Sequence, residues 1–168
     1  MSASAWMLGA CGMGVGPLAI YLKGEGWDVS GWDDSTGSPM ELQLANADIP
    51  VLRDPWAAGR RPSVVGRSSA VKPGHAALAL ADRHEVRTLR RGELLAEAVA
   101  DRRFVAVCGS HGKTTTCGLL VAALASAGAD FGYVLGGLFR DPTFPPARAS
   151  ASSPWVVAEV DESDGTIG

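Results

Sequence analysis

The sequence contains no apolar run that reaches the roughly 18 residues needed to cross a membrane. Its first four residues carry no charge, and the apolar stretch that follows is broken at Gly9, so no signal peptide is expected. Cysteine is scarce as well. The three cysteines, Cys11, Cys108 and Cys117, lack the spacing of metal ligands and indicate free, mostly buried thiols in a reducing compartment. We therefore expect a cytoplasmic protein without a membrane span.

Basic residues do not predominate either. The formal net charge of −3 argues against binding to nucleic acid, because a phosphate backbone demands a clustered basic surface. The arginines are scattered, and the pairs at 60–61, 90–91 and 102–103 are expected to be mostly solvated. Lysine is rare: one of only three lysines, Lys113, directly follows a glycine at the start of an expected helix.

What the chain does contain is a series of short apolar runs that alternate with helix-like segments, the pattern of an α/β fold with a mainly parallel sheet. With 46% apolar and 20% charged residues, the 168-residue chain has a globular composition and room for one small domain plus part of another. Strands are predicted at 6–8, 27–31, 63–66, 86–89, 104–108, 131–135 and 155–160, and helices at 15–23, 40–47, 76–81, 93–99 and 113–127. Residues 139–153, rich in proline, alanine and serine, are predicted to form a surface loop.

The most informative motif lies at residues 109–116, between an apolar strand and a helix. Its glycines allow backbone N–H groups to curl around an anion, and the following helix directs its positive end at the same place. The loop is shorter than the usual G-x-x-x-x-G-K-[ST], but its context is the one that phosphate binding requires. The residues expected to bind ATP are Gly109, Ser110, His111, Gly112, Lys113, Thr114 and Thr115. Lys113 would reach the β- and γ-phosphates, and the Thr114 hydroxyl would ligate Mg²⁺.

An acidic partner for the metal is expected at the end of a neighbouring strand, because Mg²⁺ prefers carboxylate oxygens. The apolar run 155–158 leads into four acidic residues within residues 159–164, of which Glu159 is the preferred metal ligand. In an extended strand Glu159 and Asp161 point to the same side. The alternative is a solvated acidic turn.

A second glycine loop, at residues 9–16, also follows a strand and opens a helix. Gly9 and Gly14 match the ends of G-x-G-x-x-G, but Cys11 stands where the middle glycine should be, which makes ordinary NAD binding doubtful. Asp33, just after the second strand, occupies the position of a ribose or base contact. The loop is therefore either a nucleotide-diphosphate site or a structural turn.

Taken together, seven motifs in this order and spacing make the chain similar to the Mur ligase family. They are LGACGMG at 8–14, VSGWD at 29–33, SSAVKP at 68–73, RRGELLAE at 90–97, GSHGKTTT at 109–116, GG at 136–137 and AEVDESD at 158–164. The resemblance implies a Rossmann-like UDP-sugar-binding domain at 1–101 and, at 102–168, the start of a central P-loop ATPase domain. It also implies that the remainder of that domain and a third, amino-acid-binding domain are absent from these residues.

The resemblance further implies an ATP- and Mg²⁺-dependent ligase that joins L-alanine to the lactyl carboxylate of UDP-N-acetylmuramate through an acyl phosphate, in peptidoglycan synthesis. Lys113 would be catalytic, steadying the phosphates in transfer, and Thr114 and Glu159 would hold the metal. The residues implied to bind the UDP-sugar are Gly9, Ala10, Cys11, Gly12, Met13, Gly14, Asp33 and Ser69.

The sequence leaves two other functions open. Cys11-Gly12 and the segment 37–40 also resemble a branch of the family that adds a tripeptide during cell-wall recycling. Separately, the position after Pro73 is Gly74-His75, where the family more usually has an asparagine, a departure that concerns substrate contacts. A non-catalytic module that binds only the nucleotide-sugar is the third possibility.

Ligation by this chain alone is not expected. Because residues 102–168 bury little apolar surface by themselves, with strands 104–107 and 156–160 short of neighbours, they should pack on the first domain, self-associate or be poorly ordered.

Overall fold

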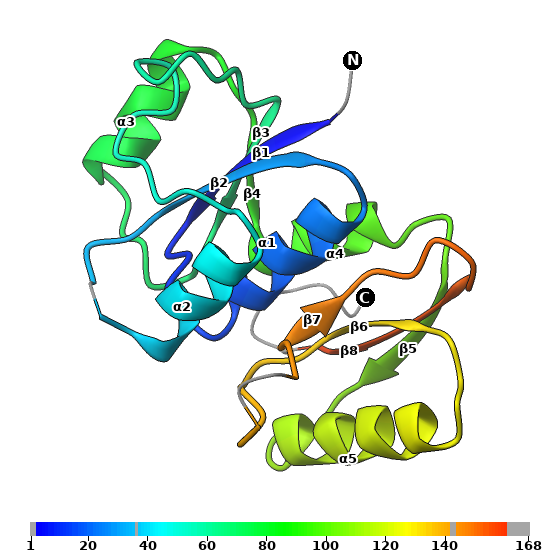
Figure 1. Cartoon of the computed structure of the whole chain (residues 1–168). Helices are drawn as coiled ribbons and strands as arrows, with labels where there is room; N and C mark the ends of the chain where they lie inside the picture. Colours follow the sequence, from blue (N-terminus) through cyan, green and yellow to red (C-terminus); the bar gives the residue numbers. More distant parts are fainter. Residues whose placement is uncertain (1–2, 36, 142–143, 161–168) are drawn as a thin grey trace.

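The computed structural model describes residues 3–35, 37–141 and 144–160, which form two four-stranded sheets, each with its own helices (Figure 1). In the first sheet all pairings are parallel and the strand order is β2-β1-β3-β4. Its elements are β1 (Ser4–Leu8), α1 (Val15–Gly24), β2 (Asp28–Trp32), α2 (Pro39–Asn46), β3 (Val64–Arg67), α3 (Ala76–Arg83), β4 (Thr88–Arg90) and α4 (Arg91–Ala98). Helices α1, α2 and α4 pack on one face of this sheet and α3 packs on the other. The predicted α/β class with a parallel sheet is confirmed.

The second sheet has the order β5-β8-β6-β7. Its elements are β5 (Arg103–Val107), α5 (Lys113–Ser126), β6 (Gly132–Val134), β7 (Ala147–Arg148) and β8 (Trp155–Glu159). The parallel strands β5, β8 and β6 are joined by one antiparallel strand, β7, which lies inside the segment predicted to be a surface loop. That prediction was wrong for residues 147–148, because a two-residue strand is too short to produce a recognisable apolar alternation.

Helix α1 lies between the two sheets (Figure 1), and every residue from Val15 to Leu22 is buried. One side of the helix packs on the first sheet, and the other side contacts β6 and β7 of the second. The contact is close at Gly132, where an added Cβ would lie 3.2 Å from the Tyr21 ring. The helix predicted at 15–23 is therefore buried on all sides from Val15 to Leu22, as a helix covered on both sides must be. Three outcomes were expected for residues 102–168, and the structure shows one of them, packing against the first half of the chain.

Arg102 strengthens this junction. Its guanidinium donates to a Glu25 carboxylate oxygen at 2.7 Å and to the carbonyls of Ser150 (3.3 Å) and Ser153 (3.1 Å). The Arg102 and Glu25 side chains are 23% and 17% exposed, so the pair is partly desolvated. The expectation of a solvated arginine is wrong here, because the fold brings the end of α1 and the loop before β8 around Arg102.

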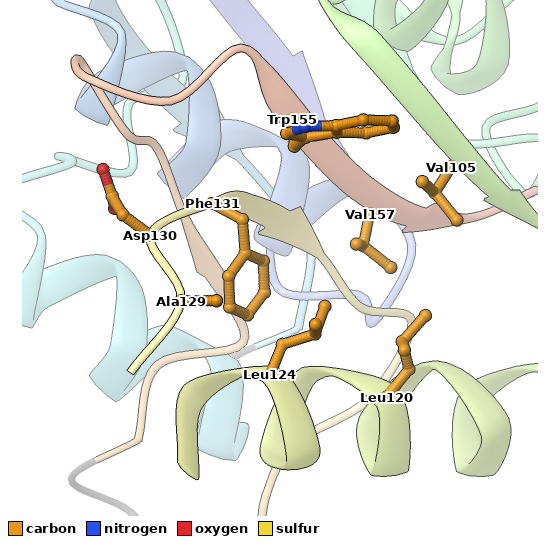
Figure 2. A pocket seen from close by; sticks show the side chains of 8 residues that line it. All are labelled: Val105, Leu120, Leu124, Ala129, Asp130, Phe131, Trp155 and Val157. Carbon is orange, nitrogen blue, oxygen red and sulfur yellow. The ribbon is translucent and has the colours of Figure 1, made fainter. Parts of the chain in front are cut away.

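Strand β5 forms the open edge of the second sheet, with Phe104 37% exposed, as expected for a strand short of neighbours. The same expectation was wrong for β8, which lies between β5 and β6. Beneath β5, apolar side chains from α5, β5 and β8 face a cavity of about 340 Å³ (Figure 2). Its lining is Val105, Leu120, Leu124, Ala129, Asp130, Phe131, Trp155 and Val157. An almost wholly hydrocarbon lining is unsuited to a triphosphate, so this cavity is not the candidate site.

Within the described part of the chain, no helix is long and apolar enough to cross a membrane.

Candidate functional site

The phosphate loop connects β5 to α5, and its conformation depends on two glycines. Gly109 has a φ of +142° and Gly112, the N-cap of α5, has a φ of +76°, values that side-chain-bearing residues rarely adopt. The 14-residue helix α5 begins directly after Gly112, so its free N–H groups and the positive end of its dipole point at the loop. This is the local geometry that binds anions.

The Lys113 ammonium lies on the loop. Its Nζ donates a hydrogen bond to the Gly109 carbonyl oxygen at 2.8 Å, and the side chain is partly buried. The side chains of Ser110, His111 and Thr114 are exposed at the mouth of the loop, with Ser110 Oγ and His111 Nδ1 3.3 Å apart. A positive charge and the start of a helix therefore converge on one open surface.

The two candidate metal ligands lie against one double-glycine turn. A Cβ added to Gly137 would be 2.8 Å from Thr114 Cγ2, and one added to Gly136 would be 1.5 Å from Glu159 Oε1. Only residues without a side chain allow Thr114 and Glu159 to approach the turn this closely. The adjacent glycines thus bring together a residue from the start of α5 and one from the end of β8.

The Glu159 carboxylate has an oxygen that needs a partner. Oε2 is buried and has no hydrogen-bond partner among the described residues, a costly state for an ionised group. Burial, and secondarily the charge of Glu159, raise the pKa of the nearby Cys117 thiol to about 11. A cation at this carboxylate would supply the missing partner, so the donor set fits Mg²⁺. Asp161 and the rest of the predicted acidic run lie outside the described residues.

The first glycine loop connects β1 to α1 and is held by β2. The amides of Gly9 and Ala10 donate to the Trp32 carbonyl oxygen at 2.8 and 3.0 Å. Cys11 is only 6% exposed and belongs to the core, whereas Gly12, Met13 and Gly14 are exposed. The cysteine in place of the middle glycine therefore points inward and leaves the outer surface of the loop open.

Asp33 has a structural task that sequence reasoning did not predict. Its Oδ2 accepts the Cys11 amide and its Oδ1 accepts the Ser35 amide, both at 2.8 Å. The carboxylate therefore fixes the conformation of the glycine loop. An aspartate directly after β2 indicates a side chain near the glycine loop, but the sequence does not show which backbone amide its carboxylate accepts.

A cleft of about 380 Å³ opens beside this loop. It is lined by Gly9, Gly12, Trp32, Asp33, Asp34, Ser68, Ala70, Val71, Lys72 and His75. Gly9, Gly12 and Asp33 were predicted site residues. Ser69 is not part of the lining, although both of its neighbours are, and Lys72 and His75 were not predicted. Lys72 belongs to the motif SSAVKP at 68–73, so its cation could have been assigned to the cleft from the sequence.

His75 is held in one orientation. Its Nδ1 accepts the Ala77 amide at 3.1 Å as the N-cap of α3, and its ring meets Trp32 edge-on at 4.4 Å. Because Nδ1 is an acceptor, Nε2 carries the proton, and it lies 3.9 Å from Asp34 Oδ2. The cleft thus combines an open glycine loop, a lysine and an oriented imidazole, a donor set that suits an anionic nucleotide.

Comparison with known proteins identifies the family of the chain. The sequence profile of the Mur ligase family, catalytic domain, matches residues 6–103, which end just before the phosphate loop. The chain belongs to the Mur ligase family.

The UDP-N-acetylmuramate–L-alanine ligase of Kineococcus radiotolerans is 39% identical over 164 residues, which are 96% of this chain and 34% of that protein. The enzyme of the same name from Roseiflexus sp. is 36% identical, with the same shares covered. Among solved structures, the UDP-N-acetylmuramate:L-alanyl-gamma-D-glutamyl-meso-diaminopimelate ligase of Neisseria meningitides superposes with a TM-score of 0.82 at 26% identity. That match covers 96% of this chain and 53% of the other. The chain spans about a third of the length of the curated relatives.

Proposed function

We propose that this chain carries the sugar-nucleotide site and the ATP-phosphate site of an ATP-dependent ligase that joins L-alanine to UDP-N-acetylmuramate in cytoplasmic peptidoglycan synthesis. The observation that carries the proposal is the meeting of Thr114 and Glu159 at one turn, with a buried, unpartnered Glu159 oxygen. This arrangement, beside a lysine-bearing helix start, is the one that a metal-bound triphosphate requires. The 39% identity to an alanine-adding relative supports the choice of substrates.

In this proposal the chain divides at 101/102. Residues 1–101 bind the UDP-sugar in the cleft beside Gly9 and Asp33, with its diphosphate at the start of α1. Residues 102–168 bind the ATP phosphates at the loop 109–115. The cavity in Figure 2 takes no part, because its lining is hydrocarbon.

The residues have separate tasks. Lys113 neutralises charge on the β- and γ-phosphates while the lactyl carboxylate of the sugar nucleotide is phosphorylated, and the alanine amine then displaces phosphate. Thr114 and Glu159 hold Mg²⁺, which when bound neutralises phosphate charge. The protein's contribution is mainly orientation: two substrates must be held so that a carboxylate of one meets a phosphate of the other.

A tripeptide-adding activity is the second candidate. It is favoured by the superposition on the Neisseria meningitides enzyme, whose name specifies a tripeptide amine. We prefer alanine because the alanine-adding relatives are closer in sequence, at 36–39% against 26% identity.

Isothermal titration calorimetry with UDP-N-acetylmuramate and with Mg·ATP, each added separately to the 168-residue chain, tests the proposal. Binding of both ligands is expected. Ligation is not expected, because the 168 residues cover only about a third of the length of a relative that carries the full ligase name. Binding of the sugar nucleotide alone would indicate a non-catalytic module. Binding of neither would refute every function considered for this chain.

A further inference from the structure

Arg91 connects the two candidate sites directly. It is 7% exposed, and its Nε donates to the Gly14 carbonyl oxygen at 3.1 Å while its Nη2 donates to the Glu159 carbonyl oxygen at 3.3 Å. Gly14 belongs to the sugar-nucleotide loop and is the N-cap of α1, and Glu159 carries the candidate metal ligand at the end of β8. One buried guanidinium therefore holds the backbone of both sites.

The position of Arg91 is itself well fixed. The Glu93 carboxylate accepts the Arg90 amide at 2.6 Å, so α4 begins at Arg91 immediately after β4. Leu94 and Leu95, at 0% and 2% exposed, anchor α4 in the core of the first sheet. The guanidinium thus projects from a rigid base toward Gly14 and Glu159.

We propose that Arg91 is a positioning residue that couples the two sites, so that occupation of the sugar-nucleotide loop improves binding of Mg·ATP, and the reverse. The inference rests on the proposed function. A planar guanidinium holds two acceptors in a fixed mutual geometry. A diphosphate that orders the Gly14 peptide therefore also orders the Glu159 backbone. Because the coupling is a difference in binding free energy, it acts equally in both directions.

A positive charge at this place also suits the ligands. Each site is proposed to bind a polyanion, and a guanidinium between them reduces the repulsion that the second ligand meets. Arg102 also bridges the two halves of the chain, but its partners, Glu25 and the carbonyls of Ser150 and Ser153, belong to neither glycine loop. Bridging the halves and coupling the sites are therefore separable by mutation.

The test measures the Kd of Mg·ATP by calorimetry with and without saturating UDP-N-acetylmuramate. We expect the sugar nucleotide to tighten Mg·ATP binding by about 5-fold or more in the unmodified chain, a typical coupling. The ratio of the Kd values without and with sugar nucleotide should fall close to 1 in Arg91→Met. It should be reduced in Arg91→Lys, which keeps the positive charge but loses the planar guanidinium that donates to two acceptors at once. The same factor should appear when the order of ligands is reversed.

Two matched variants serve as controls. Arg90→Met makes the same substitution at the adjacent, exposed arginine, and Arg102→Met removes the other bridge between the halves. Both should retain the coupling of the unmodified chain. If Arg91→Met does not fold, as judged by circular dichroism, Arg91→Lys decides alone.

The outcomes distinguish this inference from the proposed function. If the unmodified chain binds both ligands independently, or if the Arg91 variants keep the full coupling, Arg91 has no coupling role and the proposed function stands. If the unmodified chain fails to bind either ligand, the proposed function and the inference fall together.

Discussion

Thr114 and Glu159 approach the same turn from two different elements, Thr114 against Gly137 from the start of α5 and Glu159 against Gly136 from the end of β8. A Cβ at Gly136 would displace the Glu159 carboxylate, and one at Gly137 would crowd the Thr114 methyl group. The double glycine is therefore the structural condition for the candidate metal site, and its chemistry can be tested without altering a ligand.

Gly136→Ala is expected to weaken Mg·ATP binding by about 10- to 100-fold, the usual cost of disturbing the support of a metal ligand. The reason is steric: the added Cβ would lie 1.5 Å from Glu159 Oε1 and displace the carboxylate. Calorimetry with Mg·ATP measures the loss, and UDP-N-acetylmuramate binding should be unaffected. The control is Gly118→Ala in α5, where the Cβ would lie 3.9 Å from Phe139 and should be harmless. Undiminished Mg·ATP affinity in Gly136→Ala would exclude Glu159 as the ligand.

Lys113→Met should weaken Mg·ATP binding by about 1.5–3 kcal/mol, roughly 10- to 150-fold, because a hydrogen bond to a charged group is lost. The stability of the fold should change little, since among the described residues Lys113 donates one hydrogen bond, to the Gly109 carbonyl. Lys23→Met, at the end of α1, removes an equal charge away from the loop and should bind Mg·ATP normally. Equal affinities of the two variants would assign the loop a purely structural role.

Asp33→Ala should weaken UDP-N-acetylmuramate binding and lower the free energy of unfolding by about 1–3 kcal/mol, the cost of leaving a partly buried amide without its acceptor. The affected amide is that of Cys11, so the glycine loop loses its fixed shape. Calorimetry and urea unfolding measure the two effects. Asp54→Ala is a matched control, because Asp54 also accepts a nearby amide, that of Ala57, at 2.9 Å, but outside the cleft. It should leave sugar-nucleotide affinity unchanged, and an equal loss in both variants would contradict a specific role for Asp33.

The two tyrosines predict a loss of stability at alkaline pH. Burial, and for Tyr21 secondarily the charge of Glu25, raise the pKa of both Tyr21 and Tyr133 to about 12, from 10. The folded state therefore keeps protons that the unfolded state releases. The resulting stabilisation is complete below pH 10 and is lost as the pH rises from 10 to about 12. Denaturant unfolding across this range, with tyrosinate absorbance as a second probe, measures the effect.

Phenylalanine variants separate the two contributions. Tyr21→Phe should cost little stability at neutral pH, because Tyr21 Oη is buried without a partner among the described residues. Tyr133→Phe should cost about 1 kcal/mol, because Tyr133 Oη donates to the Pro145 carbonyl at 3.0 Å. Each variant should reduce the slope with which the free energy of unfolding falls between pH 10 and about 12. A slope that is unchanged in both would mean that neither tyrosine is the titrating group.

Both glycine loops could be predicted from the sequence because their physics is local. A strand, glycines that tolerate positive φ and a helix start are contiguous in the chain, at 105–116 and again at 6–16. Element positions were similarly accessible, although ends shifted by a few residues: β4 was predicted at 86–89 and is Thr88–Arg90. Strand β7 was missed because its two residues are defined by pairing with β6 and by nothing in their own sequence.

The partners of individual side chains could not be predicted in the same way. Asp33 was predicted as a ribose or base contact, which stays a prediction, whereas its hydrogen bonds to the Cys11 and Ser35 amides depend on the exact path of β1 and β2. Arg91 and Arg102 were expected in solvent, because an arginine in the sequence carries no sign of what will surround it. Each is buried or partly buried by segments that lie far away along the chain.

The sequence alone determined the α/β class, the two loops and the residue types that can meet phosphate, since these depend on neighbours in the chain. Tertiary structure decided that α1 is enclosed by two sheets, that Gly136 and Gly137 gather Thr114 with Glu159, and that Arg91 lies between the sites. These relationships join residues that are distant in sequence, and they arise only when the two sheets bury their apolar faces against a shared helix.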